Sequence, residues 1–224
     1  MKTEERKDAV LLHPDSPATS AVIWLHGLGA DGFDFVPIVP ELELPKNHGL
    51  RFVFPHAPVR PVTLNGGMPM RAWYDILSLT RGGLQDEAGV RDSARIVERF
   101  IQSELDAGIA ASRIVLAGFS QGGAIALHAG LRYPQRLGGL LPLSTYLPLH
   151  EKLAAEASAA NRDVPILMCH GTFDSRLPYA LGDTSRKELE KLGYRVEWRE
   201  YPMDHQVCLE EIEEIGAWLR KTFF

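Results

Sequence analysis

A serine stands between two glycines in the segment Gly118-Phe119-Ser120-Gln121-Gly122. A serine hydroxyl becomes a useful nucleophile only when a neighbouring base removes its proton, and G-x-S-x-G is the pattern that exposes such a serine on a sharp strand-to-helix turn. The two glycines suit that turn because side chains two residues before and after the serine would collide with the strand and the helix. Ser120 is therefore a candidate nucleophile, and a plain glycine-rich turn is the alternative interpretation.

An acid and a base follow the last two predicted strands. The segment GTFDSRLP offers Asp174 after the apolar run VPILMCH, and the segment PMDHQ offers His205 after RVEWREY. The chain order Ser120, Asp174, His205 is the order in which an α/β-hydrolase sheet carries a catalytic triad, with the histidine as base and the aspartate orienting it. Each candidate follows the carboxyl end of a predicted strand, so the three side chains can converge.

Other histidines and aspartates have structural interpretations. His170 ends its strand, where we expect it to pack against the turn. Asp204 precedes His205 and is expected to cap the last helix through its carboxylate, and Asp183 has the same interpretation at another predicted helix start. The remaining candidates lie at predicted strand ends or on a helix, where a structural histidine is the more common case: His26, His56 and His128.

Two backbone N–H groups are expected to stabilise an oxyanion beside Ser120. The N–H of Gln121 has no helical partner because it lies at a helix start. The first strand ends in the glycine-rich turn HGLGADGFDF, where the N–H of Leu28 is the natural second donor. Such a turn could also cradle a phosphate, but it lacks both GxGxxG and the GK[ST] of a P-loop, so nucleotide binding is not indicated.

Short apolar runs predict the strands that position these residues. Most runs are unbroken rather than alternating, which is typical of strands buried on both faces. A further run, AVLL (9–12), is expected to pair with the first of them. The predicted strands are AVIWLH (21–26), RFVF (51–54), RIVLAG (113–118), GGLLPLS (138–144), VPILMCH (164–170) and RVEWREY (195–201).

Segments with helical spacing separate the strands. In QDEAGVRDSARIVERFIQSELDAG the apolar residues Val90, Ala94 and Val97 begin a pattern with steps of three or four, and Gly108 follows where a glycine commonly ends a helix. The final segment, residues 208–219, repeats this spacing. Alternating strands and helices predict an α/β fold, a mostly parallel central sheet with helices on both faces. Such sheets bind ligands beyond the carboxyl ends of their strands.

The composition argues against several classes of protein. A chain of 224 residues suits a single domain over 1–224, and a net charge of -5 with scattered basic residues gives no footprint for nucleic acid. The N-terminus lacks the apolar stretch of a signal peptide, and no apolar run is long enough for a membrane span, so we expect a cytoplasmic protein rather than an integral membrane protein. Cys169 and Cys208 lack metal-ligand spacing, so we expect core packing and no metal.

Six segments together resemble a known family: LHGLGADGFDF, RAWYDI, LAGFSQGG, LSTYLP, HGTFD and YPMDH. They are similar to the carboxylesterase/acyl-protein thioesterase (phospholipase/carboxylesterase) family of small α/β-hydrolases, especially its bacterial carboxylesterases, from about residue 21 to the C-terminus. The resemblance implies an α/β-hydrolase fold with Ser120 as nucleophile, His205 as base and Asp174 as orienting acid, and oxyanion amides from Leu28 and Gln121. Members cleave short to medium acyl esters, and some cleave thioesters on S-acylated proteins or lysophospholipids. They need no cofactor, and several form homodimers.

Two positions depart from the family pattern. After Asp174 the family usually carries small apolar residues, as in D-x-V-V-P, whereas this chain has SRLP. Arg176 is expected either to narrow the acyl site or to favour an anionic group. Phe33 stands where relatives often carry histidine, which changes the mouth of the site but not its donors.

The segment PVTLNGGMPMRAWYDI (61–76) is rich in apolar residues and glycine. This composition fits a mobile flap over an apolar acyl groove, and it fits a well-packed surface loop equally well. Trp73 and Leu177 are the expected substrate contacts, and packing under the loop is the alternative for Trp73.

The resulting hypothesis is a serine carboxylesterase that hydrolyses short to medium acyl esters through an acyl-enzyme. The alternative is an acyl-protein thioesterase or lysophospholipase that acts on longer acyl chains of lipids or S-acylated proteins. A non-catalytic binding module with the hydrolase fold is the remote alternative.

Overall fold

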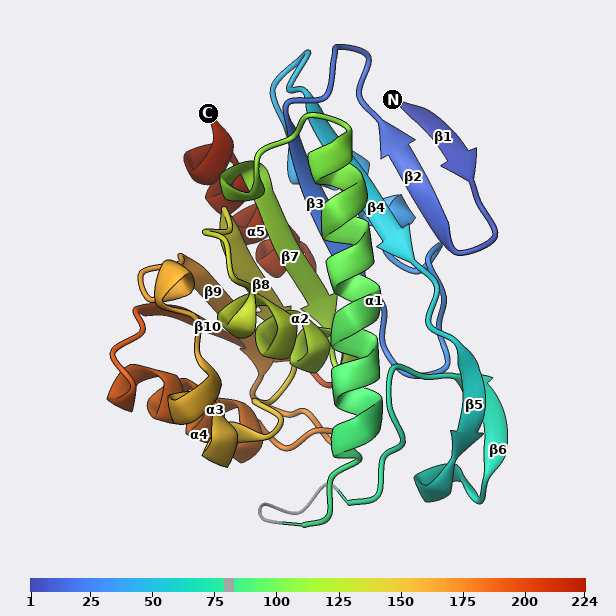
Figure 1. Ribbon diagram of the computed structural model, residues 1–224, viewed down its shortest axis with the longest axis vertical. Coiled ribbons are helices and arrows are strands. Elements are labelled where there is room, and N and C mark those ends of the chain that lie inside the picture. The colour runs from blue at the N-terminus through green and yellow to red at the C-terminus, as the bar shows by residue number, and fades with distance from the viewer. Residues whose placement is uncertain (79–82) are drawn as a thin grey trace.

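Eight strands form one sheet in the computed structural model, which describes residues 1–78 and 83–224 (Figure 1). These strands are β1 (Lys2–Glu5), β2 (Ala9–His13), β3 (Ser20–Leu25), β4 (Leu50–Pro55), β7 (Ile114–Phe119), β8 (Gly139–Leu143), β9 (Ile166–Gly171) and β10 (Val196–Tyr201). Their order across the sheet is β1-β2-β4-β3-β7-β8-β9-β10. Pairing is parallel from β4 to β10 and antiparallel for β1 and β2. The mostly parallel sheet predicted from the sequence is confirmed.

The six main predicted strands are present within two residues of their expected bounds. The prediction that residues 9–12 pair with the first of them is wrong, because β2 pairs antiparallel with β4. Both edges of β3 are already occupied, one by β4 and the other by β7. The short outer strand β1, which was not predicted, has the sequence KTEE, in which all residues but the threonine are charged and most are exposed. Charged side chains are typical of an edge strand because they discourage pairing with other molecules.

The two faces of the sheet are covered by different helices. Along β3, Ala21, Ile23 and Leu25 belong to one buried apolar cluster, and Val22 and Trp24 belong to another. Successive side chains of a strand point to opposite faces, so a strand that is apolar throughout contributes to both clusters. The single-domain architecture with helices on both faces follows from these unbroken apolar strands.

Five α-helices occur among the described residues, with α1 and α2 against one face and α5 against the other (Figure 1). The carboxylate of Asp86 accepts a hydrogen bond from the N–H of Gly89 at the start of α1. Gly108, at φ +88°, follows the end of α1, as predicted from the sequence. The helices are α1 (Glu87–Asp106), α2 (Gln121–Arg132), α3 (His150–Glu156), α4 (Tyr179–Lys191) and α5 (Leu209–Phe223).

The glycine-bearing segment 61–76 contains most of a β-hairpin that the sequence did not predict. Strands β5 (Val59–Val62) and β6 (Met68–Arg71) pair antiparallel, and Gly66 and Gly67 at its tip both have positive φ. Each strand contains a proline, which argues against a strand when only the sequence is considered. The hairpin stands apart from the main sheet, at the end where the parallel strands have their carboxyl termini (Figure 1).

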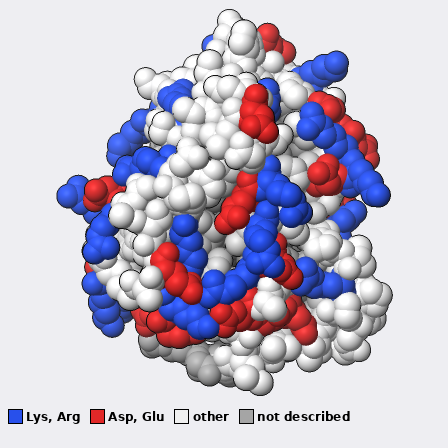
Figure 2. Space-filling view, viewed as in Figure 1, with Lys and Arg blue, Asp and Glu red and all other residues white. Residues whose placement is uncertain are grey.

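Charges of both signs intermingle on the face that carries α1. Figure 2 shows Lys and Arg next to Asp and Glu over this face. Glu156 accepts charged hydrogen bonds from both Arg91 and Arg132, and Glu87 pairs with Lys152. Within the part of the chain that the structure describes, no helix has the length and apolar character needed to cross a membrane.

A buried carboxyl group lies near the start of α5. The side chain of Glu211 is fully buried, and this burial raises its pKa to about 8, against weaker opposing hydrogen bonds from the Cys208 backbone and the Cys169 thiol. In the folded state Glu211 therefore keeps its proton up to about pH 8, whereas a carboxyl in the unfolded chain loses it near pH 4.5. The folded state binds more protons between these values, so this group lowers stability as pH rises.

Replacement of Glu211 by glutamine tests this pH dependence. Glu211→Gln keeps the shape of the neutral side chain, so its free energy of unfolding should gain on that of the wild type as pH rises from 4.5 to 8. At about 1.4 kcal/mol per pKa unit, the upper limit of this gain is about 5 kcal/mol. Urea unfolding of both proteins across this range measures it, and other titrating groups cancel in the difference. A difference that is constant with pH would contradict the assignment.

Candidate active site

Ser120 occupies the sharp turn between β7 and α2. Its backbone has φ +54° and ψ -120°, a strained conformation for a residue with a side chain. A Cβ atom on Gly118 would lie 2.4 Å from the backbone of Gly122, and one on Gly122 would lie 2.3 Å from the carbonyl oxygen of Leu25. Only glycine fits at either position. The predicted strand-turn-helix setting of Ser120 is thus present, together with the physical reason for both glycines.

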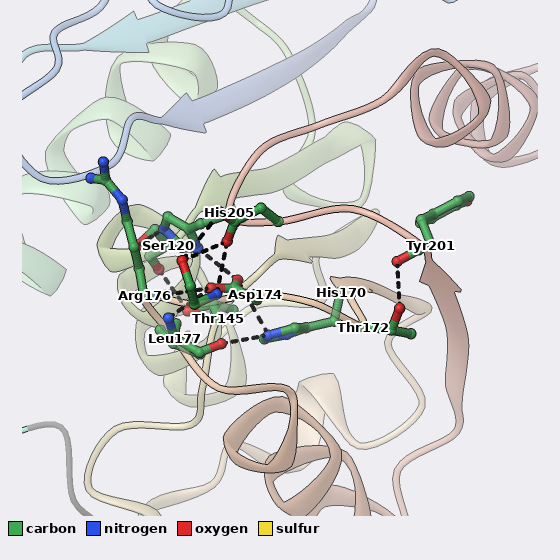
Figure 3. Close-up of polar contacts among 11 residues, drawn as sticks. Ser120, Thr145, His170, Thr172, Asp174, Arg176, Leu177, Tyr201 and His205 are labelled. Atoms are coloured by element: carbon green, nitrogen blue, oxygen red, sulfur yellow. Dashed lines mark hydrogen bonds and ion pairs between the residues drawn. The ribbon is translucent and has the colours of Figure 1, made fainter.

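His205 and Asp174 form a hydrogen-bonded chain with Ser120 (Figure 3). The Nε2 atom of His205 lies 2.9 Å from the Oγ of Ser120, and its Nδ1 atom lies 2.7 Å from the Oδ2 of Asp174. In the tautomer that suits both contacts, Nδ1–H donates to the carboxylate and Nε2 accepts the serine proton. This is the arrangement in which a histidine acts as general base on a hydroxyl.

The carboxylate of Asp174 is oriented by its own loop. Its Oδ1 atom accepts hydrogen bonds from the backbone N–H groups of Arg176, at 3.0 Å, and Leu177, at 2.7 Å. These two bonds leave Oδ2 free to face His205. Because the donors are backbone groups, the identity of the next side chains does not alter how Asp174 is held.

Asp204 joins the Asp174 loop to the His205 loop. Its Oδ1 atom accepts hydrogen bonds from the backbone N–H and the Oγ–H of Ser175, and from the N–H of His205, each at 2.8 Å. The prediction that Asp204 caps the last helix is wrong, since Cys208 occupies the N-cap position of α5. The carboxylate of Asp204 instead accepts its hydrogen bonds from Ser175 and from the backbone of His205.

Two rivals for the acid and base have other partners. His170 is buried, and its Nε2–H donates to the carbonyl of Leu177 at 3.0 Å, so it supports the loop that carries Asp174. Burial lowers the pKa of His170, more than the nearby Asp174 carboxylate raises it. The prediction that Asp183 caps a helix start is wrong, because Pro178 occupies the N-cap of α4 and Asp183 lies inside this helix, where it pairs with Arg186 and Lys187.

The other histidines considered from the sequence are structural. His26 accepts a hydrogen bond from the N–H of Ala57 through Nε2, and His56 accepts one from the N–H of Gly32 through Nδ1. Burial lowers the pKa of His26 to about 4 and that of His128 to about 3, so both are neutral at neutral pH. The neutral form of His26 is required here, because a protonated Nε2 could not accept from Ala57.

The expected oxyanion donors border the same cavity as Ser120. Leu28 and Gln121 both line it, and in the described part of the chain neither backbone N–H has a hydrogen-bond partner. The loop that carries Leu28 is tied down by its neighbour, since the N–H of Gly29 donates to the carbonyl of Arg71 at 2.8 Å. Free N–H groups on a fixed backbone beside a nucleophile suit the stabilisation of developing negative charge.

A cavity of about 630 Å³ opens at Ser120 and His205. This volume lies within the range of small-molecule sites. Apolar side chains from the hairpin and the following segment form much of its wall, together with Leu177, whose contact with a substrate stays a prediction. The other lining residues are Gly27, Leu28, Ala30, Asp34, Leu64, Asn65, Met70, Tyr74, Ile76, Phe119, Gln121, Tyr146 and Arg176.

Comparison with known proteins identifies the family. A model of the Phospholipase/Carboxylesterase family matches residues 6–223 of the chain. The chain belongs to this family. Acyl-protein thioesterase 1 of Gibberella zeae is 41% identical to it over 217 residues, which are 92% of each chain. The crystal structure of Zea mays acyl-protein thioesterase 2 has a TM-score of 0.86 at 28% identity, over 96% of this chain and 99% of that chain.

Other solved structures share the fold. The crystal structure of Arabidopsis thaliana SOBER1 has a TM-score of 0.87 at 30% identity, over 92% of this chain and 99% of that chain. A Bacillus cereus carboxylesterase shares the fold, with a TM-score of 0.76 at 20% identity over 96% of this chain and 94% of that chain. The protein is therefore an enzyme, an α/β-hydrolase of the esterase and thioesterase type.

Trp73, expected to contact substrate, is fully buried and does not line the cavity. Its indole N–H donates to the carbonyl of His26, and its backbone N–H donates to the Oε1 of Gln121. The side chain of Gln121 also donates through Nε2 to the carbonyl of Tyr74. Trp73 thus packs beneath the loop and joins it to the turn of Ser120, whereas the next residue, Tyr74, faces the cavity.

Three residues of the site were missed in the sequence. The hydroxyl of Thr145 donates to the carbonyl of Ser120 at 2.6 Å, which supports the strained turn from the end of β8. The hydroxyls of Tyr74 and Tyr146 lie 2.8 Å apart at the cavity wall. Thr145 and Tyr146 directly follow a predicted strand, so the rule that a ligand binds beyond strand ends could have found both.

Substitution of Gly122 by alanine tests the close contact at the turn. The added Cβ would lie 2.3 Å from the Leu25 carbonyl, so the backbone must shift, and we expect a loss of about 3 kcal/mol or more in the free energy of unfolding. Gly193→Ala is the control, since Gly193 has φ +89° and no atom within 4 Å of the added Cβ, and it should lose only about 1–2 kcal/mol. Guanidinium chloride unfolding measures both. Equal losses would contradict the proposed role of the close contact.

Proposed function

We propose that the protein hydrolyses thioesters and esters of fatty acyl chains with Ser120, His205 and Asp174, and that it acts as an acyl-protein thioesterase. The observation that carries this proposal is the hydrogen-bonded chain from Ser120 Oγ through His205 to Asp174 at an apolar cavity. A nucleophile, a base and an orienting acid in contact are the parts that acyl transfer to serine needs.

The first half of the reaction forms an acyl-enzyme. His205 Nε2 takes the proton of Ser120 as Oγ attacks the carbonyl carbon, and Asp174 stabilises the imidazolium through Nδ1–H. The N–H groups of Leu28 and Gln121 donate to the resulting oxyanion. When the tetrahedral intermediate collapses, the carbon–sulfur bond of a thioester breaks and the thiol leaves with the proton from His205.

The second half releases the fatty acid. Water enters beside His205, which takes a proton from it as the oxygen attacks the acyl carbon. The same N–H groups stabilise the second oxyanion. Collapse breaks the bond to Ser120 Oγ, which receives the proton back from His205. The cycle needs no added cofactor, as the family resemblance implies.

Acyl-protein thioesterase activity is favoured over a general carboxylesterase by two observations. Relatives of about 40% identity over nearly the whole chain carry the name acyl-protein thioesterase 1. The cavity wall includes the apolar side chains of Leu64, Met70, Ile76 and Leu177, which suits an acyl chain longer than a few carbons. Hydrolysis of shorter oxygen esters is the second candidate, because the same three residues can attack either kind of carbonyl.

A cytoplasmic location and a homodimer were expected from the sequence, the second from the family resemblance alone. Both stay predictions. Small thioester or ester molecules, lipids and S-acylated proteins are the substrates that the proposed chemistry would accept.

Labelling with a fluorophosphonate tests the nucleophile and its base. A single adduct should form on Ser120 of the wild type, as shown by intact mass and peptide mapping. Ser120→Ala should take no label and lose about 10⁴-fold or more in kcat with its fold retained, and His205→Ala should react far more slowly. A Ser120→Ala protein that keeps a tenth of the activity, or labelling of another residue alone, would exclude the proposed mechanism.

Acyl-chain length separates the two candidate functions. For thioesters of one thiol that differ only from butyryl to palmitoyl, kcat/KM should rise with chain length, because each buried methylene contributes up to about 0.8 kcal/mol. Release of free thiol, measured below the micelle concentration of each substrate, gives the rates. Values that fall beyond the shortest chains would favour the carboxylesterase instead.

A further inference from the structure

Arg176 and Leu177 follow Asp174 and point in different directions. The N–H groups of both residues are bound by the Oδ1 of Asp174, so their backbone is held in place. The side chain of Leu177 is buried in the cavity wall, whereas Arg176 is exposed. One apolar contact therefore faces the interior of the cavity, and the adjacent cation stands at its rim.

The guanidinium group of Arg176 has no partner among the residues that the structure describes. No hydrogen bond or ion pair joins it to another side chain in residues 1–78 and 83–224. In the view of Figure 3 the side chain extends past Ser120, away from Asp174, in the direction of the loop that follows β3. An arginine free of internal partners can offer its planar fork of N–H donors to a carboxylate from outside.

The cavity separates apolar from charged groups. The apolar wall contains Leu177, Leu64, Met70 and Ile76, where an acyl chain would bury most surface. Arg176 lies at the rim, so it would meet the other part of the substrate, the thiol portion that leaves through the opening.

One acidic side chain lies on the same cavity and opposes Arg176. Asp34 borders the cavity on the loop after β3, and partial burial together with the nearby Asp31 raises its pKa. The opposite charges of Arg176 and Asp34 act in opposite directions on a charged substrate. An anion near Arg176 is attracted, and an anion near Asp34 is repelled.

We propose that Arg176 makes the enzyme selective for thioesters whose thiol portion carries a negative charge, such as an acidic peptide segment around an acylated cysteine. This inference rests on the proposed thioesterase function and adds the class of substrate. Arg176 is a specificity-determining residue and takes no part in the proton transfers. Its side chain acts on the leaving thiol portion, while its backbone N–H holds Asp174 as that of any residue would.

A pair of matched peptides tests the selectivity. Both carry one S-octanoyl cysteine, flanked by two glutamates in one peptide and by two glutamines in the other, so the scissile bond is the same. The wild type should have a kcat/KM about three- to tenfold higher for the glutamate peptide, as expected for one solvent-accessible charge pair with good geometry. High salt should reduce this ratio by screening the charges.

Three variants locate the effect. Arg176→Gln should lower the ratio of the two kcat/KM values to one or somewhat below, because Asp34 still repels the glutamates, and Arg176→Glu should lower it further in favour of the glutamine peptide. Asp34→Asn is the matched control at the same cavity, and it should raise the ratio by removing the repulsion. Circular dichroism and fluorophosphonate labelling of each variant check that its fold and nucleophile are intact.

The outcomes distinguish this inference from the proposed function. If the wild type cleaves both peptides but Arg176→Gln leaves their ratio unchanged, the selectivity assigned to Arg176 is wrong and the thioesterase function stands. If the wild type cleaves neither peptide while short oxygen esters are hydrolysed, the thioesterase function itself fails. A ratio that follows the charge at position 176 supports both.

Discussion

The site depends on how closely α2 can begin beneath the ends of β3 and β7. Backbone atoms of Gly118 and Gly122 approach each other and the Leu25 carbonyl so tightly that a single Cβ would not fit. This contact forces Ser120 into a positive φ that it would not adopt alone, and it lifts the hydroxyl above the sheet. The same turn leaves the Gln121 N–H without a helical partner. The proposed nucleophile and one of the two proposed oxyanion donors therefore come from one backbone constraint.

The other two residues of the proposed triad must reach back across the sheet. Strands β7 and β10 are three positions apart in the strand order, which corresponds to roughly 14 Å, so His205 cannot meet Ser120 unless its loop folds inward. Asp204 holds this loop by accepting hydrogen bonds from Ser175 and from the His205 backbone. Phe119 packs against the imidazole at a tilt of 45°, with ring centres 4.7 Å apart. These neighbours restrict the ring to the position in which both nitrogens are used.

The parts that could be predicted from the sequence are those with a local signal. The six main strands are continuous apolar runs, and the glycines around Ser120 act on their immediate neighbours. What failed depends on contacts between distant segments. From the sequence, a tryptophan in a loop is equally consistent with a substrate contact and with packing. Only the hydrogen bond from the Trp73 indole to the His26 carbonyl shows that Trp73 packs beneath the loop. The sequence of residues 9–12 does not indicate that β4 has an edge free for pairing and that β3 has none, so the partner of β2 could not be predicted from it.

Because backbone groups hold the acid of the proposed triad, side chains near it can change substrate selectivity without changing the proposed chemistry. Asp174 is oriented by N–H groups that residues 176 and 177 supply whatever their side chains are. A change from the apolar residue usual in the family to Arg176 therefore alters the rim of the cavity without removing a donor from the acid. Substitution of a residue that positions by its side chain, such as Asp204, would disturb both loops at once. A change in the side chain is thus least costly to the proposed triad at a position such as 176, whose side chain faces the opening and whose backbone N–H holds Asp174.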